Sequence, residues 1–484
     1  MGAKVLRAGG NAVDAAVATA FAIGTVEPWM SGLGGGGVML VYSAAEDRVH
    51  GIDFTMVAPA ALDTADYPLA EGAGGDLFGW PAVVDDRNLR GALSIAVPGE
   101  VAGLAQALEH FGTRGWAESL APAIGLAEQG MEADWYASLL IATAAGDLAR
   151  DPVAAPTFLP DGVPPVSDWM GSAPCLHLGR LAQTLRQLAA EGPQSFYSGD
   201  LARRVAADVQ AAGGRLSVED LGRYAVGEPD PVTTDFAGAT VHAPAGLTAG
   251  PTLVQALEHL GATTPRPGAP GADHFVAYAR ALRAAYGDRL ATMGDGAPAP
   301  SCTTHISVID ADGNMVALTQ TLLSLFGSKV MLPETGILMN NGIMWFDPRP
   351  GGPNSIAPGR RPLSNMCPAI MTGPASRVAL GASGGRRILP AIFQIVAYLG
   401  ECGMDLETAF HAPRIDVSGG DTVFCDRRLA PEILSALAAE FSVTPVTAGV
   451  YPVHFACPNA VQWQAERQSA CAFIHSPWAQ ARAA

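Results

Sequence analysis

Thr303-Thr304-His305-Ile306-Ser307-Val308-Ile309-Asp310 is a stretch in which two hydroxyl residues open a run with the alternation of a β-strand. A threonine hydroxyl is a weak nucleophile near neutral pH. If the chain were cut before Thr303, the new α-amine, which titrates at about pH 8, would lie beside Oγ and could act as its base. Because β-branched pairs are also common in ordinary strands, this stretch alone does not establish a catalytic role.

The composition describes a compact globular protein. The chain has 484 residues, of which 49% are hydrophobic and 15% charged, enough for two domains or one large sandwich. The net charge of −17 argues against nucleic acid as a partner, since phosphate binding requires clusters of Lys and Arg. Seven dispersed cysteines without CxxC pairs indicate buried thiols, so we expect no metal and no cofactor.

The N-terminal region predicts a buried helix. Asn11 is a good N-cap for a helix from Ala12 to Val26, and Asp14 interrupts its apolar run. The run lacks the basic start and cleavage site of a signal peptide, and no segment has the length of a membrane span without charges. A cytoplasmic location is the default expectation, although a strand or an export signal could precede Met1.

Further helices are expected within 100–150 and 178–225, with a Pro/Gly-rich surface excursion at 151–175, and over 270–293. The segment 294–302 is low in regular structure and suits a cleavage site. Strands are expected after the glycine run 32–37 and downstream, without βαβ alternation, at 38–42, 305–310, 315–321, 368–372 and 378–382. The glycine run lacks the Lys-Ser/Thr ending of a phosphate loop. This order favours an α+β fold of antiparallel sheets covered by helices.

Six motifs occur in order along the chain, and together they resemble the γ-glutamyltransferase family of N-terminal nucleophile hydrolases. They are Gly9-Gly10-Asn11-Ala12-Val13-Asp14-Ala15-Ala16, Gly32-Leu33-Gly34-Gly35-Gly36-Gly37, Thr303-Thr304-His305-x-Ser307-Val308, Gly336-Ile337-Leu338-x-Asn340-Asn341, Arg361-Pro362-Leu363-Ser364 and Gly384-Gly385-x-Arg387-Ile388. The resemblance implies an αββα four-layer sandwich made as one precursor. Residues 1–302 would form a large subunit and 303–484 a small catalytic subunit, both contributing to one sandwich.

The resemblance also implies catalytic roles. Thr303 would attack the carbonyl of Cys302 to cut the chain, and mature Thr303 would then attack an amide substrate with its own amine as base. Thr321 matches the family's second active-site threonine and would orient the Thr303 amine. Gly384 and Gly385 match the oxyanion-hole pair, whose N–H groups meet the developing negative charge.

The positions that hold the γ-glutamyl group in the family carry different residues here. By ungapped alignment the family's large-subunit arginine falls at Thr64, beside the carboxylate of Asp63, which would repel an anion. The small-subunit Asn, Glu/Gln, Asp and Ser-Ser positions fall, in that order, at Leu323, Gly342, Trp345 and Ser364-Asn365. Each missing charge-assisted contact is worth about 1.5–3 kcal/mol, so free γ-glutamyl donors should bind poorly.

Two of these departures suggest a different acyl group. Leu323 and Trp345 predict a more hydrophobic donor site, as in acylases of the cephalosporin type within the family; core packing is the alternative. Arg386 stands where the family has serine, at a helix N-terminus that disfavours a cation. It indicates an anionic ligand near the oxyanion hole, such as a short oxamate-like amide, unless it is a solvated surface arginine.

The leading interpretation is therefore an autoprocessed N-terminal-threonine amidohydrolase or acyltransferase acting on a small-molecule amide, with further oligomerisation open. The alternatives are a true γ-glutamyltransferase or glutathione hydrolase, an uncut scaffold without activity, and a thiol enzyme that uses Cys302 but lacks an identified base.

Overall fold

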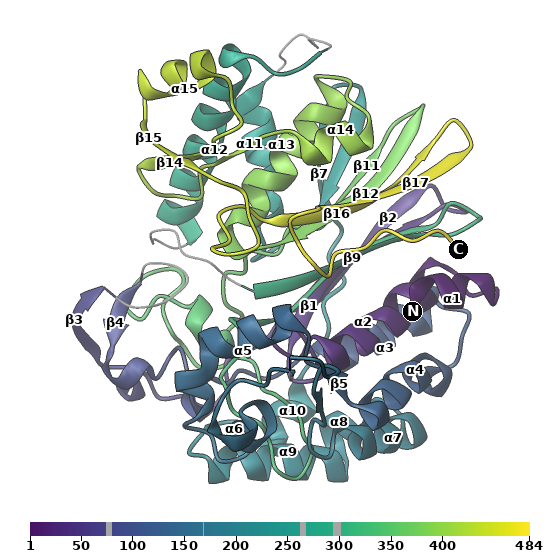
Figure 1. Ribbon diagram of the computed structural model, residues 1–484, viewed down its shortest axis with the longest axis vertical. Coiled ribbons are helices and arrows are strands. Elements are labelled where there is room, and N and C mark those ends of the chain that lie inside the picture. Colours follow the sequence, from purple (N-terminus) through teal and green to yellow (C-terminus); the bar gives the residue numbers. More distant parts are fainter. Residues whose placement is uncertain (74–79, 168, 262–267, 294–301) are drawn as a thin grey trace.

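A computed structural model describes residues 1–73, 80–167, 169–261, 268–293 and 302–484, and shows two facing sheets between layers of helices (Figure 1). The strand order is β2-β1-β10-β9 in a four-stranded sheet and β17-β16-β12-β11-β8-β7 in a six-stranded sheet. All neighbouring strands in both sheets are antiparallel. The predicted α+β sandwich of antiparallel sheets is confirmed.

Each sheet combines strands from both sides of the Cys302–Thr303 bond. The four-stranded sheet contains β1 (Gly36–Ser43), β2 (Arg48–Phe54), β9 (Cys302–Ile309) and β10 (Met315–Leu323). The six-stranded sheet contains β7 (Val232–Phe236), β8 (Ala239–Ala243), β11 (Ala369–Thr372), β12 (Ser376–Ser383), β16 (Cys457–Gln464) and β17 (Arg467–Ala472). The parts before and after residue 302 therefore interleave.

Helices cover the outer face of each sheet. The four-stranded sheet packs against α2 (Ala12–Val26) and α3 (Glu100–Phe111), whereas the six-stranded sheet packs against α11 (Gly250–Leu260) and α13 (Ile388–Gly400). Helix α12 (Ala272–Met293) lies on α11, and its bounds agree with the helix predicted over 270–293. Among the described helices, none is long and apolar enough to cross a membrane.

The other elements surround this sandwich. Smaller sheets are formed by β3 (Leu69–Ala73) with β4 (Pro81–Val83), β5 (Met131–Glu132) with β6 (Cys175–Leu176), and β13 (Ile415–Asp416), β14 (Thr422–Asp426) and β15 (Ser442–Val446). The other helices are α1 (Gly2–Arg7), α4 (Trp116–Gln129), α5 (Trp135–Leu148), α6 (Ala154–Phe158), α7 (Leu181–Glu191), α8 (Ser195–Ser198), α9 (Asp200–Ala211), α10 (Val218–Arg223), α14 (Leu406–His411) and α15 (Pro431–Ala438).

Two expectations about these helices have different outcomes. Asn11 caps α2 as predicted: its side chain accepts from the Val13 and Asp14 amides, and the Asp14 carboxylate accepts from the Asn11 amide. The description of 151–175 as a surface excursion is wrong in part. Helix α6 lies within it, and Phe158 is fully buried. Burial of this apolar side chain in the core lowers the free energy of the folded state.

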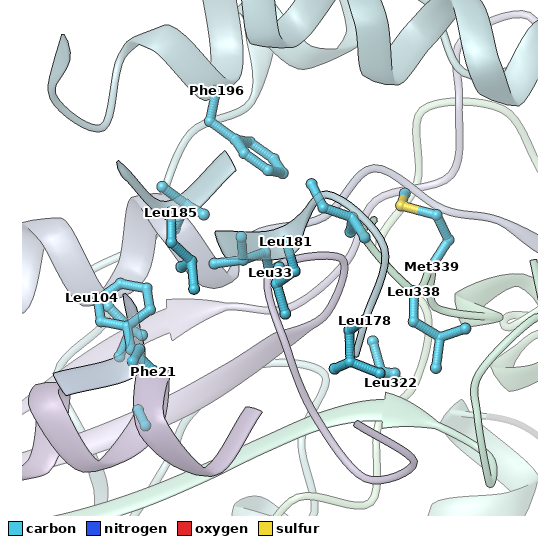
Figure 2. Close-up of a cluster of buried hydrophobic side chains, with 14 of the residues drawn as sticks. Phe21, Leu33, Leu104, Leu178, Leu181, Leu185, Phe196, Leu322, Leu338 and Met339 are labelled. Atoms are coloured by element: carbon cyan, nitrogen blue, oxygen red, sulfur yellow. The ribbon is translucent and has the colours of Figure 1, made fainter. Parts of the chain in front are cut away.

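An apolar cluster fixes the back of β10 (Figure 2). Phe21 from α2, Leu104 from α3 and Leu185 from α7 belong to this core together with Leu322, which follows Thr321 in β10. Each of the four side chains is 3% exposed or less. Because Leu322 is held from the helix side, its neighbour Thr321 is presented on the opposite face of the strand.

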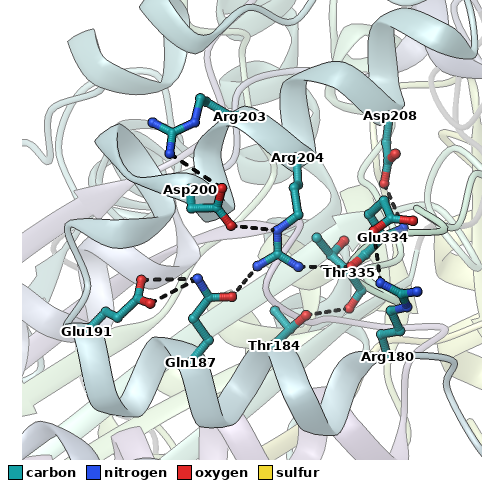
Figure 3. Close-up of polar contacts among 10 residues, drawn as sticks. All are labelled: Arg180, Thr184, Gln187, Glu191, Asp200, Arg203, Arg204, Asp208, Glu334 and Thr335. Atoms are coloured by element: carbon teal, nitrogen blue, oxygen red, sulfur yellow. Dashed lines mark hydrogen bonds and ion pairs between the residues drawn. The ribbon is translucent and has the colours of Figure 1, made fainter.

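Polar contacts join the part before residue 302 to the part after it (Figure 3). Arg180 pairs with Glu334 at 2.9 Å, and Arg204 Nη1 donates to Glu334 O over 3.2 Å. Thr184 Oγ1 donates to Thr335 O over 2.7 Å within the core. The exposed ion pair adds little stability, but the buried hydrogen bond fixes α7 against the segment around 335.

Candidate active site

Thr303 is the second residue of β9 and is 4% exposed. Alternate side chains of a strand point to opposite faces, so Thr303 and His305 share one face and Thr304 lies on the other. Thr304 faces the helix layer, where Ser31 Oγ lies 3.5 Å from Thr304 Oγ1. His305 lies on Gly381 of β12: a Cβ on that glycine would be 2.2 Å from the imidazole Cε1. Thr303 therefore faces the six-stranded sheet.

The register between the sheets directs Thr303 toward one end of β12. Asn459 Nδ2 donates to His305 O over 2.7 Å, and Gln468 Nε2 donates to Asp310 O over 2.6 Å. Asn459 pairs with the third residue from the end of β12, whereas Gln468 lies opposite the strand's beginning. Going back along β9 from His305 to Thr303 therefore leads toward the turn that follows β12.

That turn contains the glycine pair expected to form the oxyanion hole. Gly384 has φ +136° and Gly385 has φ +63°, and a Cβ on Gly384 would lie 2.9 Å from the Cα of Ala456. Only glycine adopts this conformation and approaches another backbone so closely. The turn continues through the 3-10 helix η6 (Gly385–Arg387) into α13, so its N–H groups lie at a helix start.

Thr321 lies beside Thr303 on the neighbouring strand. The ladder pairs Thr304 with Gln320, and a bulge then shifts the register up to Leu323. Leu323 has φ +86°, rare for a branched side chain, and its amide donates to Thr321 Oγ1 over 2.8 Å. The bulge thus orients the Thr321 hydroxyl, and the structure brings together the two predicted threonines.

His305 has a structural role. Its Nδ1 lies 2.8 Å from Thr319 Oγ1 and its Nε2 lies 3.0 Å from Ser307 Oγ. Burial lowers the pKa of His305 to about 3, because a charged imidazole would lose its hydration. The imidazole is therefore neutral, and each of its nitrogens lies within hydrogen-bond distance of a hydroxyl.

Leu323 and Trp345 lie in one buried cluster. They are 1% and 3% exposed, and Trp345 belongs to the 3-10 helix η5 (Gly342–Trp345). The cluster also contains Val38, Met56, Ala58, Leu62, Tyr67, Trp80, Val83, Ala96, Ile343, Met344, Phe346, Ile356 and Met366. The two residues pack as core, the alternative considered for them from the sequence.

Ser364 and Asn365 lie on a segment beside an open cavity. Ser364 is fully buried, and its Oγ has no hydrogen-bond partner among the residues that the structure describes. Its amide donates to Leu247 O over 2.8 Å. Leu247 in turn lines a cavity of about 330 Å³, together with Thr292, Met293, Phe346, Pro353, Asn354, Arg360 and Arg361. An unpaired buried hydroxyl is costly, although Ser364 itself does not line this cavity.

Arg386 is not a solvated surface arginine, so that alternative is wrong. It is 4% exposed, and its guanidinium carbon lies 5.9 Å from the centroid of the Trp80 ring. Arg349 lies 5.7 Å from the same ring. The aromatic face favours a nearby cation and offsets part of the cost of its burial. A buried positive charge therefore stands directly after the glycine pair.

Thr64 lies between Leu62 and Tyr67, which belong to the buried cluster of Leu323 and Trp345. It is exposed at the start of the 3-10 helix η1 (Thr64–Asp66), where Asp63 accepts from the Ala65 amide over 2.9 Å.

Cys302 begins β9, and the segment 294–301 lies outside the described residues. Within the described part of the chain, no group of three or more His, Cys, Asp and Glu could hold a metal ion.

Two facing sheets lie between helix layers, and Thr303, at the start of the edge strand β9, faces toward a glycine turn. This arrangement defines an N-terminal-nucleophile hydrolase. The sequence profile of gamma-glutamyltranspeptidase matches residues 1–301 and 296–470. The chain belongs to the gamma-glutamyltranspeptidase family. It is an enzyme of the amidohydrolase and acyltransferase type that this family comprises.

Individual relatives agree with this assignment. The Acylase ACY 1 proenzyme of Pseudomonas sp. (strain SE83) is 35% identical over 460 residues, 87% of this chain and 80% of that protein. The glutathione hydrolase proenzyme of Bacillus subtilis (strain 168) is 30% identical over 521 residues, 93% of this chain and 84% of that protein. The structure of cephalosporin acylase from Bacillus halodurans has a TM-score of 0.86 at 24% identity, covering 100% of this chain and 93% of its own, and shows the shared fold.

Proposed function

We propose that the chain cuts itself between Cys302 and Thr303 and then uses Thr303 as the nucleophile toward an amide substrate. The observation that carries this proposal is the placement of Thr303 beside Thr321 and toward the Gly384-Gly385 turn. Thr303 Oγ attacks the Cys302 carbonyl, the acyl group moves from nitrogen to oxygen, and water hydrolyses the ester. The products are a carboxylate at Cys302 and a free amine at Thr303. Two relatives are themselves named proenzymes.

In the mature enzyme the same groups serve the substrate. The Thr303 amine accepts the Oγ proton as Oγ attacks the substrate carbonyl, and Thr321 orients that amine. Gly384 and Gly385 donate N–H groups to the developing oxyanion, and each such donor is worth about 3 kcal/mol of barrier. The leaving amine takes the proton, and water or an acceptor amine then releases the acyl group from Thr303.

Residues 1–302 and 303–484 would remain together as large and small subunits. Strand β1, which also carries β2, pairs with β10, and β8 pairs with β11, so both sheets cross the cut. Hydrolysis of one peptide bond leaves these ladders and the buried Thr184–Thr335 hydrogen bond unchanged.

The acyl group that fits this site best combines an apolar part with a carboxylate. Leu323 and Trp345 supply an apolar wall, and buried Arg386 supplies positive charge beside the oxyanion turn. Ser364 Oγ adds an unpaired donor, next to Asn365. Glutaryl amides and oxamate-like amides meet this description, whereas the γ-glutamyl group carries an additional ammonium. The 30% identity to a glutathione hydrolase makes γ-glutamyl transfer the second candidate.

A panel of amides separates the two candidates. The assays measure release of 4-nitroaniline from glutaryl and γ-glutamyl anilides and release of ammonia from oxamate. The kcat/KM for an anionic acyl group without an ammonium should exceed that for the γ-glutamyl group by at least about tenfold, the value of one charge-assisted contact. The acyl-enzyme should appear as an acyl mass on the small subunit. Faster γ-glutamyl turnover would contradict the anionic-acyl assignment, and an acyl mass on the large subunit would contradict the role of Thr303.

A further inference from the structure

Helix α12 carries two buried polar side chains that contact opposite parts of the active site. Tyr286 and Arg289 are three residues apart, so they lie one turn apart on the same face of the helix. They are 2% and 3% exposed. Neither belongs to a motif found in the sequence, which predicted the helix but gave no indication of what this face contacts.

Tyr286 holds the oxyanion turn. Its hydroxyl donates to the main-chain oxygen of Arg386 over 2.6 Å inside the core. The turn is fixed at a second point by Arg387, whose Nη1 donates to Val453 O over 2.6 Å. Since Gly384 and Gly385 have no side chains of their own, contacts to the following residues determine where their N–H groups point.

Arg289 holds the segment of Ser364 and Asn365. Its Nη2 donates to Ser364 O over 2.6 Å and lies 3.5 Å from Asn365 Oδ1. Its Nη1 donates to Thr248 O over 2.7 Å and to Thr252 Oγ1 over 3.2 Å. Arg289 forms no salt bridge with a carboxylate in the described part of the chain, and burial lowers the pKa of its guanidinium to about 10.

The segment around Ser364 has further attachments, among them the Leu363 amide, which donates to Asn354 Oδ1 over 3.0 Å. Ser364 N donates to Leu247 O over 2.8 Å, and Ala249 N donates to Met366 O over 3.1 Å. Arg289 connects the segment around Thr248 to the segment around Ser364, because it donates to both Thr248 O and Ser364 O. A cation buried at this cost is retained where its fork of donors is needed to fix several acceptors at once.

We infer that Tyr286 and Arg289 are positioning residues: through α12 they fix the distance between the oxyanion turn and the Ser364–Asn365 segment. The helix thereby connects the Gly384-Gly385 turn, which would polarise the substrate carbonyl, to the Ser364–Asn365 segment, which would hold the acyl chain. This inference rests on the proposed function for its kinetic consequences, but its structural part is measurable without a substrate.

The kinetic test uses single variants of fully processed enzyme whose active fraction has been counted by acyl-enzyme mass. Tyr286→Phe should lower kcat at least about tenfold with KM within about threefold, because the loosened turn affects the transition state. Arg289→Met should raise KM at least about tenfold with a smaller change in kcat, and Arg289→Lys should restore part of the affinity. Tyr278→Phe is the matched control: Tyr278 is also buried on α12, but its hydroxyl contacts Glu401 and Cys402, and both constants should stay unchanged.

Amide hydrogen exchange supplies the readout that needs no substrate. Tyr286→Phe should speed exchange about tenfold or more in peptides covering 384–388 and not in those covering 362–366, and Arg289→Met should do the reverse. Uniform acceleration in both regions, or an equal effect of Tyr278→Phe, would overturn the inference. If the parent enzyme turns over no amide in the panel, the proposed function fails, and the exchange pattern alone decides whether the two residues position the segments.

Discussion

Leu323 combines backbone strain with a functional position. A leucine at φ +86° costs about 1–3 kcal/mol, yet its amide fixes the Thr321 hydroxyl and its side chain closes the apolar wall. Alignment identified the position of Leu323 and led us to expect a hydrophobic donor site. The backbone conformation was beyond sequence reasoning, because a leucine gives no signal of a positive φ.

Leu323→Gly and Leu323→Ala separate strain from side-chain packing. Both remove the isobutyl group and should widen acceptance toward bulkier acyl groups. Glycine also relieves the positive φ, so Leu323→Gly should unfold at a higher temperature than Leu323→Ala, by the equivalent of about 1 kcal/mol. Thermal unfolding of the two purified variants checks this. A higher unfolding temperature for the alanine variant would show that Leu323 is not strained in solution.

Glu100 predicts a pH dependence of stability. It is 2% exposed, and its carboxylate oxygens have no hydrogen-bond partner in the described part of the chain. Burial raises its pKa to about 8 from 4.5. A pKa shift of this size corresponds to a free energy of roughly 5 kcal/mol in favour of the protonated form. Glu100 also lies at a helix N-terminus, but that position favours the ionised form by only about 0.3–2 kcal/mol. The protonated carboxyl therefore stabilises the fold below about pH 4.5, and this contribution is lost as the pH rises through about 8.

Glu100→Gln should remove that dependence. The variant and the parent should unfold at similar temperatures at pH 5, and the variant should unfold at a higher temperature at pH 9. Glu27 and Asp416, whose pKa values burial raises to about 8 and about 6, titrate in both proteins and cancel in the comparison. Glu109→Gln, at an exposed position of the same helix, is the control. A constant difference between parent and variant across this range would refute the assignment.

At the scale of elements, the turn after β12 concentrates the chemistry. Its glycines were predicted from sequence as a motif, and their φ values of +136° and +63° explain why glycine stands there. The burial of Arg386 was not predictable, because the residues that cover it, Trp80 among them, are far away in sequence. The contacts of Tyr286 and Arg289 on α12 were not predictable either, because periodicity predicts a helix but not the residues that it contacts.

Gly384→Ala should disable the turn. The added Cβ would lie 2.9 Å from the Ala456 backbone, so the turn must shift, and the loss of one oxyanion donor predicts a fall in kcat of about 100-fold or more. Gly403→Ala is the matched control, since Gly403 also has a positive φ, +65°, but open space around it. Steady-state kinetics of both processed variants make the comparison. Equal loss of activity in the two would indicate general destabilisation instead of a displaced oxyanion hole.

At the scale of the whole molecule, the two sheets are shared between the parts before and after residue 302. The sequence predicted β9, β10 and β12 closely, because their alternation is strong. It missed β7, β8, β16 and β17, whose strand signals are weak, and these form most of the six-stranded sheet. The layering followed from the absence of βαβ alternation, whereas strand order depends on long-range pairing that no local pattern contains.

The intact masses of the purified protein's polypeptides under denaturing conditions test the central claim, self-cleavage that frees Thr303. The parent should give two chains, one ending at Cys302 and one beginning at Thr303, and Thr303→Ala should give a single uncut chain. A single chain from the parent after prolonged incubation, or normal cleavage in Thr303→Ala, would contradict the account.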